Sequence, residues 1–239
     1  MEEKKKKTVY GLSREQEQEA SRLFGRHVSM PKALCVGLAS LLCCLLPMLL
    51  GLRLWENIPP LVQTGLIGPD GADDSMPRAV LVFGVPGLFA VLDLISHAQL
   101  WLHQKLEKLP PTPVRMTGRW GIAVLGTLLC PFWLLRASGT PVTALFYLPC
   151  LLALLLMLLG AHFFDCPRGA KLAFRFKRIA CSEEDWRKTH RAAGVGWMLA
   201  GLLLLALRYG LGRIPPLSAL PLLLLLLTPL AASVLAAKE

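Results

Sequence analysis

The sequence predicts an all-α protein, a polytopic transmembrane helix bundle of about six spans with both termini in the cytoplasm. Of its 239 residues, 54% are hydrophobic, and the mean hydropathy is +0.51. Several apolar runs approach the roughly 20 residues that a helix needs to cross the hydrocarbon core, and a soluble domain of this size would not contain them. We place the spans at residues 33–52, 79–102, 120–137, 141–163, 192–211 and 218–237.

The basic residues predict the orientation of these spans. Of the 26 Lys and Arg, 21 lie in residues 1–32, 103–119, 164–191 and the carboxyl-terminal tail, and the other 5 lie in the alternate segments. Segments rich in Lys and Arg stay in the cytoplasm by the positive-inside rule. The net charge of +10 therefore reflects topology and contact with the lipid bilayer, and it does not indicate direct binding to nucleic acid.

The predicted spans divide the chain into three parts. Residues 1–32 form a cytoplasmic basic arm, in which four consecutive lysines (Lys4–Lys7) favour contact with anionic lipid; docking of a soluble partner is the alternative. Residues 33–119 form a membrane module of two spans. Residues 120–239 form a module of four spans with a cytoplasmic loop at 164–191.

Residues 53–78 form the long outside loop between the first two spans. Prolines and glycines dominate it, so we expect turns rather than strands or helix. Trp55 is expected at the membrane interface, where amphipathic aromatic side chains gather. The loop also contains acidic residues, but their spacing matches no calcium-binding loop, and we interpret them as solvated charges.

Polar residues within the spans are the first candidate site. Asp93 and His97 are four residues apart, on one face of the second span. An acid inside the hydrocarbon is costly, and it usually faces the bundle interior, a partner or water. His162 and Asp165, at the end of the fourth span, are expected at similar depth. Two interpretations stay open: a proton or ion pathway that opens to the cytoplasm, and a structural Asp–His hydrogen bond.

Motifs of enzymes and metal sites are missing from the sequence. It has no phosphate-binding loop, no nucleophile elbow and no paired CxxC. Five of the seven cysteines lie within predicted spans, and Cys166 and Cys181 lie on the predicted cytoplasmic side, away from an oxidising compartment. We therefore expect no enzymatic activity, no cofactor and no metal.

The stretch from Cys181 to Arg191 is the second candidate site. Ser182 with Asp185 three residues later is a capping box, and the acids that follow Ser182 favour the positive end of a helix. Residues four apart share a helical face, so Trp186 and His190 lie on one face and two arginines lie on the neighbouring one. The helix continues into the fifth span. The sequence thus predicts a polar cap at the membrane surface, continuous with a transmembrane helix.

This stretch resembles the cytoplasmic loop of the SdpI-like immunity-protein family of bacterial membrane proteins, in which "PNxxxGIRTPWTLSxEExWxKTHRxxG" leads into a transmembrane helix. The similarity is close from Ser182 to Gly194, and Arg175 stands at the arginine of the family pattern; Phe176–Ala180 replaces the TPWT segment. Residues 57–71 are similar to the loop "LPxxIPxHxxxxGxPDG" of an amino-terminal domain that family members often carry.

The resemblance implies a protein of the bacterial plasma membrane that confers immunity to a membrane-active peptide toxin and, in some members, sequesters a cytoplasmic transcriptional repressor. It implies a partner-binding surface on the loop, formed by Arg175, Ser182, Glu184, Trp186, Lys188, Thr189, His190 and Arg191. Trp and Arg side chains are favoured at interfaces, although they also anchor membrane helices. The alternative function is a small ion- or proton-coupled transporter that uses the polar cluster of Asp93 and His97.

Overall fold

The computed structural model describes residues 29–67, 73–105, 112–164, 166, 173–174, 183–212 and 219–236. The amino-terminal arm up to residue 28 lies outside this part of the chain, as do Asp165, Arg175, Cys181 and Ser182. Predictions made for these residues are therefore not addressed by the structure.

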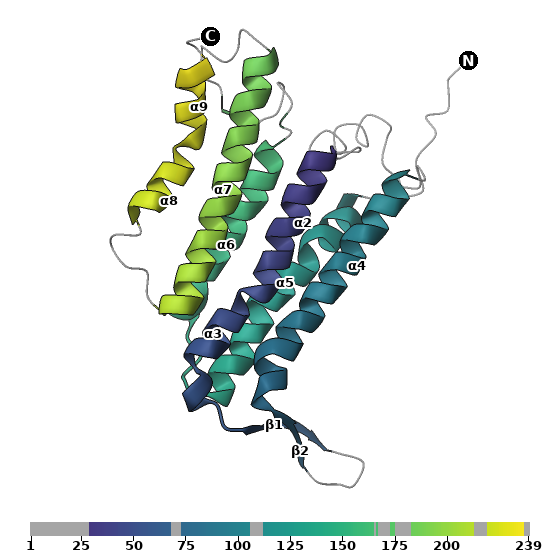
Figure 1. Ribbon diagram of the computed structural model, residues 1–239, viewed down its shortest axis with the longest axis vertical. Coiled ribbons are helices and arrows are strands. Elements are labelled where there is room, and N and C mark those ends of the chain that lie inside the picture. Colours follow the sequence, from purple (N-terminus) through teal and green to yellow (C-terminus); the bar gives the residue numbers. More distant parts are fainter. Residues whose placement is uncertain are drawn as a thin grey trace, which may run out of the picture.

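The described chain is a bundle of long helices, drawn in Figure 1. Its elements, in chain order, are α2 (Met30–Leu45), α3 (Pro47–Arg53), a 3₁₀ turn (Trp55–Asn57), β1 (Leu61–Ile67), β2 (Asp73–Pro77), a π-helical turn (Val80–Gly84), α4 (Val85–Lys105), α5 (Thr112–Ala137), α6 (Ala144–Phe163), α7 (Glu183–Leu211), α8 (Ala219–Leu226) and α9 (Thr228–Ala236). The all-α bundle predicted from the sequence is thereby confirmed.

Five helical segments within this part of the chain are long and apolar enough to cross a membrane. They are Met30–Arg53, Val80–His103, Val114–Ala137, Ala144–Phe163 and Glu183–Leu211. Each corresponds to one of the first five predicted spans. The fifth extends the predicted span by nine residues at its amino end, because the polar cap and the apolar run form one uninterrupted helix.

The sixth predicted span is formed by two short helices, α8 and α9, which meet at Leu227 (Figure 1). Pro229 has no N–H group and cannot donate to the carbonyl of Leu225. The hydroxyl of Thr228 donates to that carbonyl instead, at 2.8 Å, which satisfies the backbone at the break. Figure 1 places the amino end of α2 and the carboxyl end of α9 at the same end of the bundle. The count of six spans and their orientation stay predictions.

Two ends of the bundle can now be distinguished. The basic end is formed by the first turns of α2, α5 and α7 and the last turns of α4 and α6, where the basic segments of the sequence begin or end. The hairpin end, opposite, contains β1 and β2 (Figure 1).

The expectation of turns rather than strands in the outside loop is wrong. β1 and β2 form an antiparallel hairpin in which Val62 faces Met76 and Gln63 faces Ser75, with a bulge between Gln63 and Ile67. Pro59 and Pro60 precede β1 and Pro77 is the last residue of β2, so these prolines do not interrupt a strand, and the β-branched residues of β1 suit extended backbone. The Arg78 guanidinium lies 4.3 Å from the centre of the Trp55 ring, which attaches the base of the hairpin to the helices.

α6 and α7 pack backbone to backbone because both have glycine at the contact. A Cβ atom on Gly160 would lie 2.7 Å from the Gly194 carbonyl oxygen, and one on Gly201 would lie 2.5 Å from the Ala153 carbonyl oxygen. Small residues at such positions let membrane helices approach closely. The contact fixes the position of α7 and therefore of the polar cap at its amino end.

A second group is formed by α2, α4 and α5, which lie side by side, whereas α8 and α9 pack on α7 (Figure 1). Side-chain hydrogen bonds link the groups: the Cys43 thiol lies 3.4 Å from the Met157 sulfur, and the hydroxyls of Tyr209 and Tyr147 donate to the carbonyls of Thr127 and Leu128, at 2.9 and 3.3 Å. The division into modules at residues 119 and 120 stays a prediction. The intramembrane acid belongs to the group of α2, α4 and α5, and the polar cap belongs to the group of α6 and α7.

Candidate functional sites

Asp93 is the centre of the first site, and its side chain is fully buried between α4 and α2. The Ser40 hydroxyl donates to Asp93 Oδ2 at 2.7 Å. His97, one turn along α4, places Nε2 at 2.9 Å from Ser40 Oγ and at 3.9 Å from Asp93 Oδ2. Ser40 thus stands between the carboxylate and the imidazole and contacts both.

The proton positions in this site follow from its acceptors. His97 Nε2 also lies 3.1 Å from the Arg119 carbonyl oxygen, which can only accept, so Nε2 carries a hydrogen. Ser40 Oγ has one hydrogen and two acceptors within reach, Asp93 Oδ2 and the Gly37 carbonyl at 3.0 Å. The Oδ1 atom of Asp93 has no hydrogen-bond partner within the described chain.

His162 lies on α6 and lines a cavity of about 80 Å³ with Lys32 and Arg119, between α2, α5 and α6 at the basic end. Its ring packs edge-on against Phe163, with ring centres 5.6 Å apart. Arg119 connects this cavity with the Asp93 site, since it lines the cavity and its backbone carbonyl accepts a hydrogen bond from His97. Asp93 and His97 thus lie together around Ser40, whereas His162 lies at the neighbouring cavity.

Trp186 and His190 form the centre of the second site, at the start of α7. Both are buried, with 5% and 1% of their surface exposed, and their rings stack with centres 4.2 Å apart. Trp186 Nε1 donates to the Cys166 carbonyl at 2.8 Å. The stacked pair therefore holds the chain that leaves α6 against the first turns of α7.

The hydrogen bonds of His190 define its neutral form. Nδ1 lies 2.9 Å from the Trp186 carbonyl, to which it donates, and Nε2 accepts from the Phe174 backbone N–H at 3.2 Å. One nitrogen donates and the other accepts, which describes a neutral imidazole. The Phe174 ring packs on Phe163 with centres 4.6 Å apart. An aromatic cluster thus fixes residues 166 and 173–174 to the helix pair.

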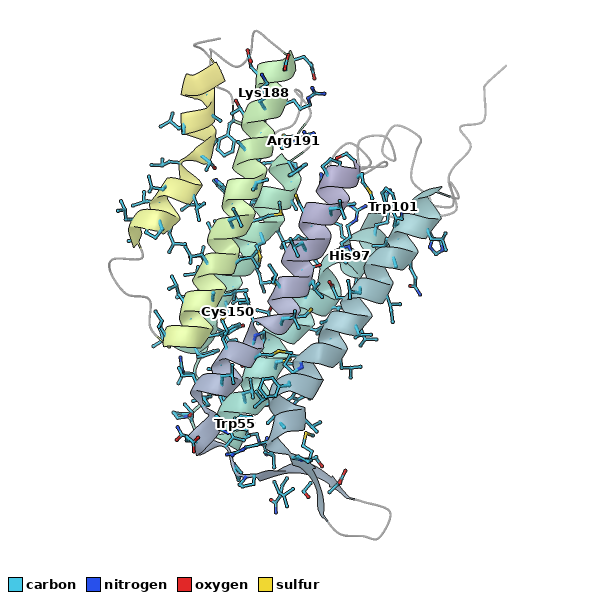
Figure 2. The ribbon with its side chains drawn as sticks, viewed as in Figure 1. Trp55, His97, Trp101, Cys150, Lys188 and Arg191 are labelled. Carbon is cyan, nitrogen blue, oxygen red and sulfur yellow. The ribbon has the colours of Figure 1, made fainter. Side chains whose placement is uncertain are left out.

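The opposite face of this cap is exposed. Lys188 Nζ pairs with Glu184 at 3.2 Å on the surface, and Arg187 is exposed one residue before it. Arg191 is also exposed, with its guanidinium 5.4 Å from the ring centre of Phe164. Figure 2 shows Lys188 and Arg191 at the upper end of α7.

The eight predicted partner-binding residues therefore fall into three sets. Glu184, Lys188 and Arg191 are exposed, and a partner can reach them directly. Trp186, Thr189 and His190 are buried, and they position the exposed face. Arg175 and Ser182 lie outside the described residues. The partner-binding role of the whole set stays a prediction.

Cys166 is the one thiol of this region within the described chain. Its side chain is buried, and this burial raises the pKa of the thiol to about 11, although the positive charge of Lys32 acts in the opposite direction. The neutral thiol is therefore the form present at physiological pH.

The sequence alone did not indicate Ser40, the Arg119 carbonyl, or the contacts of Cys166 and Phe174. Ser40 had a weak signal, as a polar residue in the first apolar span. Backbone acceptors have no signal in side-chain patterns, because every residue carries a carbonyl.

The fold and the two sites define a class: a polytopic helical membrane protein with a polar cap at the start of its last long helix. Residues 172–236 match the model of the SdpI/YfhL protein family, which confirms the predicted resemblance. This match covers α7, α8 and α9, about a quarter of the chain, and shows that this part is similar to membrane proteins of the SdpI type. The family is of the membrane immunity type and is not known to be enzymatic. No curated protein and no solved structure matches the chain.

Proposed function

We propose that this protein protects the plasma membrane of a bacterium against a membrane-active peptide toxin. The observation that carries the proposal is the two-sided cap of α7, which lies within the segment that matches the family. Its buried side, with Trp186 and His190, holds the helix in place, and its exposed side presents Arg187, Lys188 and Arg191 at the basic end.

Rigid mounting gives the exposed residues an advantage as a docking surface. α7 continues from the cap through the bundle and packs on α6 at glycine contacts, so the backbone that carries the cationic side chains loses little freedom on binding. We further propose that a cytoplasmic regulator, a transcriptional repressor, docks on this face. Cations that are close together favour a partner with an acidic patch, through faster and more specific encounter.

A survival assay tests protection. The chain is expressed in a sensitive Gram-positive host, which is then challenged with an Sdp-type peptide toxin. The charge reversal Arg187→Glu with Arg191→Glu is expected to abolish protection at unchanged membrane abundance. Arg136→Glu is the matched control, since Arg136 is also exposed but lies at the carboxyl end of α5. Absence of protection by the wild-type chain, at confirmed membrane expression, would contradict the proposal.

The buried side of the cap is tested separately. Trp186→Ala with His190→Ala removes the stacked pair and the bond to Cys166, and it is expected to reduce protection by releasing the cap. Full protection by this double variant would show that the buried side is dispensable.

Photo-crosslinking tests the docking of a regulator. A photoreactive amino acid in place of Lys188 is expected to capture a DNA-binding protein in living cells, and the same amino acid in place of Arg136 is expected not to capture it. Equal capture at both positions would argue against a docking face on the cap, while leaving protection against the toxin unaffected.

A further inference from the structure

The buried cluster of Asp93, Ser40 and His97 has the geometry of a site that binds and releases a proton. Asp93 has no exposed surface, and 17% of the His97 side chain is exposed. Figure 2 shows His97 between α2 and α4, on the basic side of the bundle. Any proton that reaches Asp93 from this end therefore meets His97 first and Ser40 second.

The ionised form of Asp93 is poorly compensated. An ionised carboxylate in low-dielectric surroundings needs several donors or a close cation. Here Ser40 supplies one hydrogen bond to Oδ2, Oδ1 has no partner within the described chain, and His97 Nε2 is 3.9 Å away. A cationic His97 would balance the charge at this distance. The pair is therefore stable only while it holds one additional proton, either on His97 as an imidazolium or on Asp93 as a carboxylic acid.

The neutral form of Asp93 is fully compatible with the same atoms. A protonated Oδ2 donates to Ser40 Oγ, and the Ser40 hydrogen turns to the Gly37 carbonyl at 3.0 Å. His97 Nε2–H keeps its bond to the Arg119 carbonyl at 3.1 Å. Ser40 therefore has one acceptor for each state, Asp93 when the carboxylate is ionised and Gly37 when it is neutral.

We propose that Asp93, Ser40 and His97 form a proton-binding site that is loaded from the basic end of the bundle. In the loading step, His97 is an imidazolium and Asp93 a carboxylate. The Nε2–H bond of His97 breaks and its proton moves to Ser40 Oγ, while the Ser40 hydrogen moves to Asp93 Oδ2. The products are a neutral imidazole with its hydrogen on Nδ1, an intact serine hydroxyl and a carboxylic acid, so no proton is gained or lost within the site. Loss of the Nδ1 proton to water at the exposed part of His97 and uptake of a proton at Nε2 then restore the bond to the Arg119 carbonyl.

A proton suits this site better than a metal ion. The hydrogen on His97 Nε2 points at the same oxygen atoms that a cation would need. Within the described chain, no group of three or more His, Cys, Asp or Glu residues is placed to hold a metal. The other titratable or charged groups that face the site are the thiols of Cys43 and Cys44 from α2 and the guanidinium of Arg119 from α5.

This inference is independent of toxin immunity and narrower than the transporter predicted as the alternative function. Binding and release at the basic end need only the three side chains. Transport would need a second path to the hairpin end, and one turn from Asp93 in that direction lies the buried Ala90.

Infrared difference spectroscopy on the full chain in lipid vesicles tests the site. Between about pH 9 and pH 4, lowering the pH is expected to produce the C=O stretching band of a neutral carboxylic acid, which Asp93→Asn removes. Ser40→Ala is expected to move this band to higher wavenumber, because the acid loses its hydrogen-bond partner. Ser96→Ala is the matched control. Ser96 lies on α4, as Asp93 does, but its hydroxyl donates to the Gly118 carbonyl, so its removal is expected to leave the band unchanged.

The opposite results overturn the proposal. A difference spectrum without an Asp93 band would show that this acid keeps one protonation state, ionised or neutral, across the pH range. If Asp93→Asn does not accumulate in the membrane, chemical labelling of the wild-type chain provides the test instead. Dicyclohexylcarbodiimide, which reacts with protonated carboxyl groups in membranes, is expected to modify Asp93 less as pH rises. Mass spectrometry that finds Asp93 unmodified would also overturn the proposal.

Discussion

Gly194 provides the sharpest test of how the cap is held in place. A Cβ atom added at this position would lie 2.8 Å from each of three backbone atoms: the Gly160 carbonyl oxygen of α6 and the N and Cα atoms of Phe164, the residue that follows α6. Ordinary contacts of a Cβ atom begin at 3.4 Å. Because backbone atoms cannot rotate away, Gly194→Ala must push the two helices apart by about 0.6 Å at this point.

The expected cost follows from this overlap. Overpacking by one methyl group costs about 1–3 kcal/mol, whereas Gly→Ala within a helix gains about 0.5–1 kcal/mol of helix propensity. Gly87→Ala is the matched control, since a Cβ atom there meets nothing within 4 Å. The propensity gain is common to both variants, so Gly194→Ala should be less stable than Gly87→Ala by about 1–3 kcal/mol.

The free energy of unfolding is measured by reversible denaturation in mixed detergent micelles, with circular dichroism as the signal. Thiol alkylation of Cys150, which is fully buried on α6, reports opening of the helix pair independently. If the two alanine variants unfold together, within about 0.5 kcal/mol, the backbone contact between α6 and α7 is not as close as described. The reasoning about the rigid cap would then fail.

The remaining predictions concern Cys166 and Trp186. Because burial raises the pKa of Cys166 to about 11, its alkylation, followed by mass spectrometry, should be about a hundredfold slower at pH 8 than that of an exposed cysteine introduced as Ser75→Cys, and its rate should still rise above pH 9; a plateau near pH 8.5 would contradict this. Trp186→Phe keeps an aromatic ring against His190 but leaves the Cys166 carbonyl without its donor, at a cost of about 1–3 kcal/mol. Alkylation of Cys166 should then be faster by about tenfold or more, and an unchanged rate would show that the Trp186 hydrogen bond does not hold this segment.

The long helices and the family resemblance could be predicted from the sequence, because both depend on local patterns. Apolar runs near 20 residues specify spanning helices regardless of their neighbours, and the spacing of Trp186 and His190 specifies a shared face of one helix. The two strands around the acidic loop were not predicted. Their pairing brings residues up to 16 apart in the chain into register, Leu61 with Pro77, and composition alone does not reveal such pairing.

The sequence by itself determined the class of this protein, a helical membrane protein with a basic end and an amphipathic cap that is similar to the SdpI/YfhL family. Only the tertiary structure decided which side of the cap is buried, because periodicity shows that two faces differ but not which one meets a neighbouring helix. The same holds for Asp93. Its cost within the membrane was evident from the sequence, but Ser40 lies 53 positions away, and only the packing of α2 against α4 brings the two together.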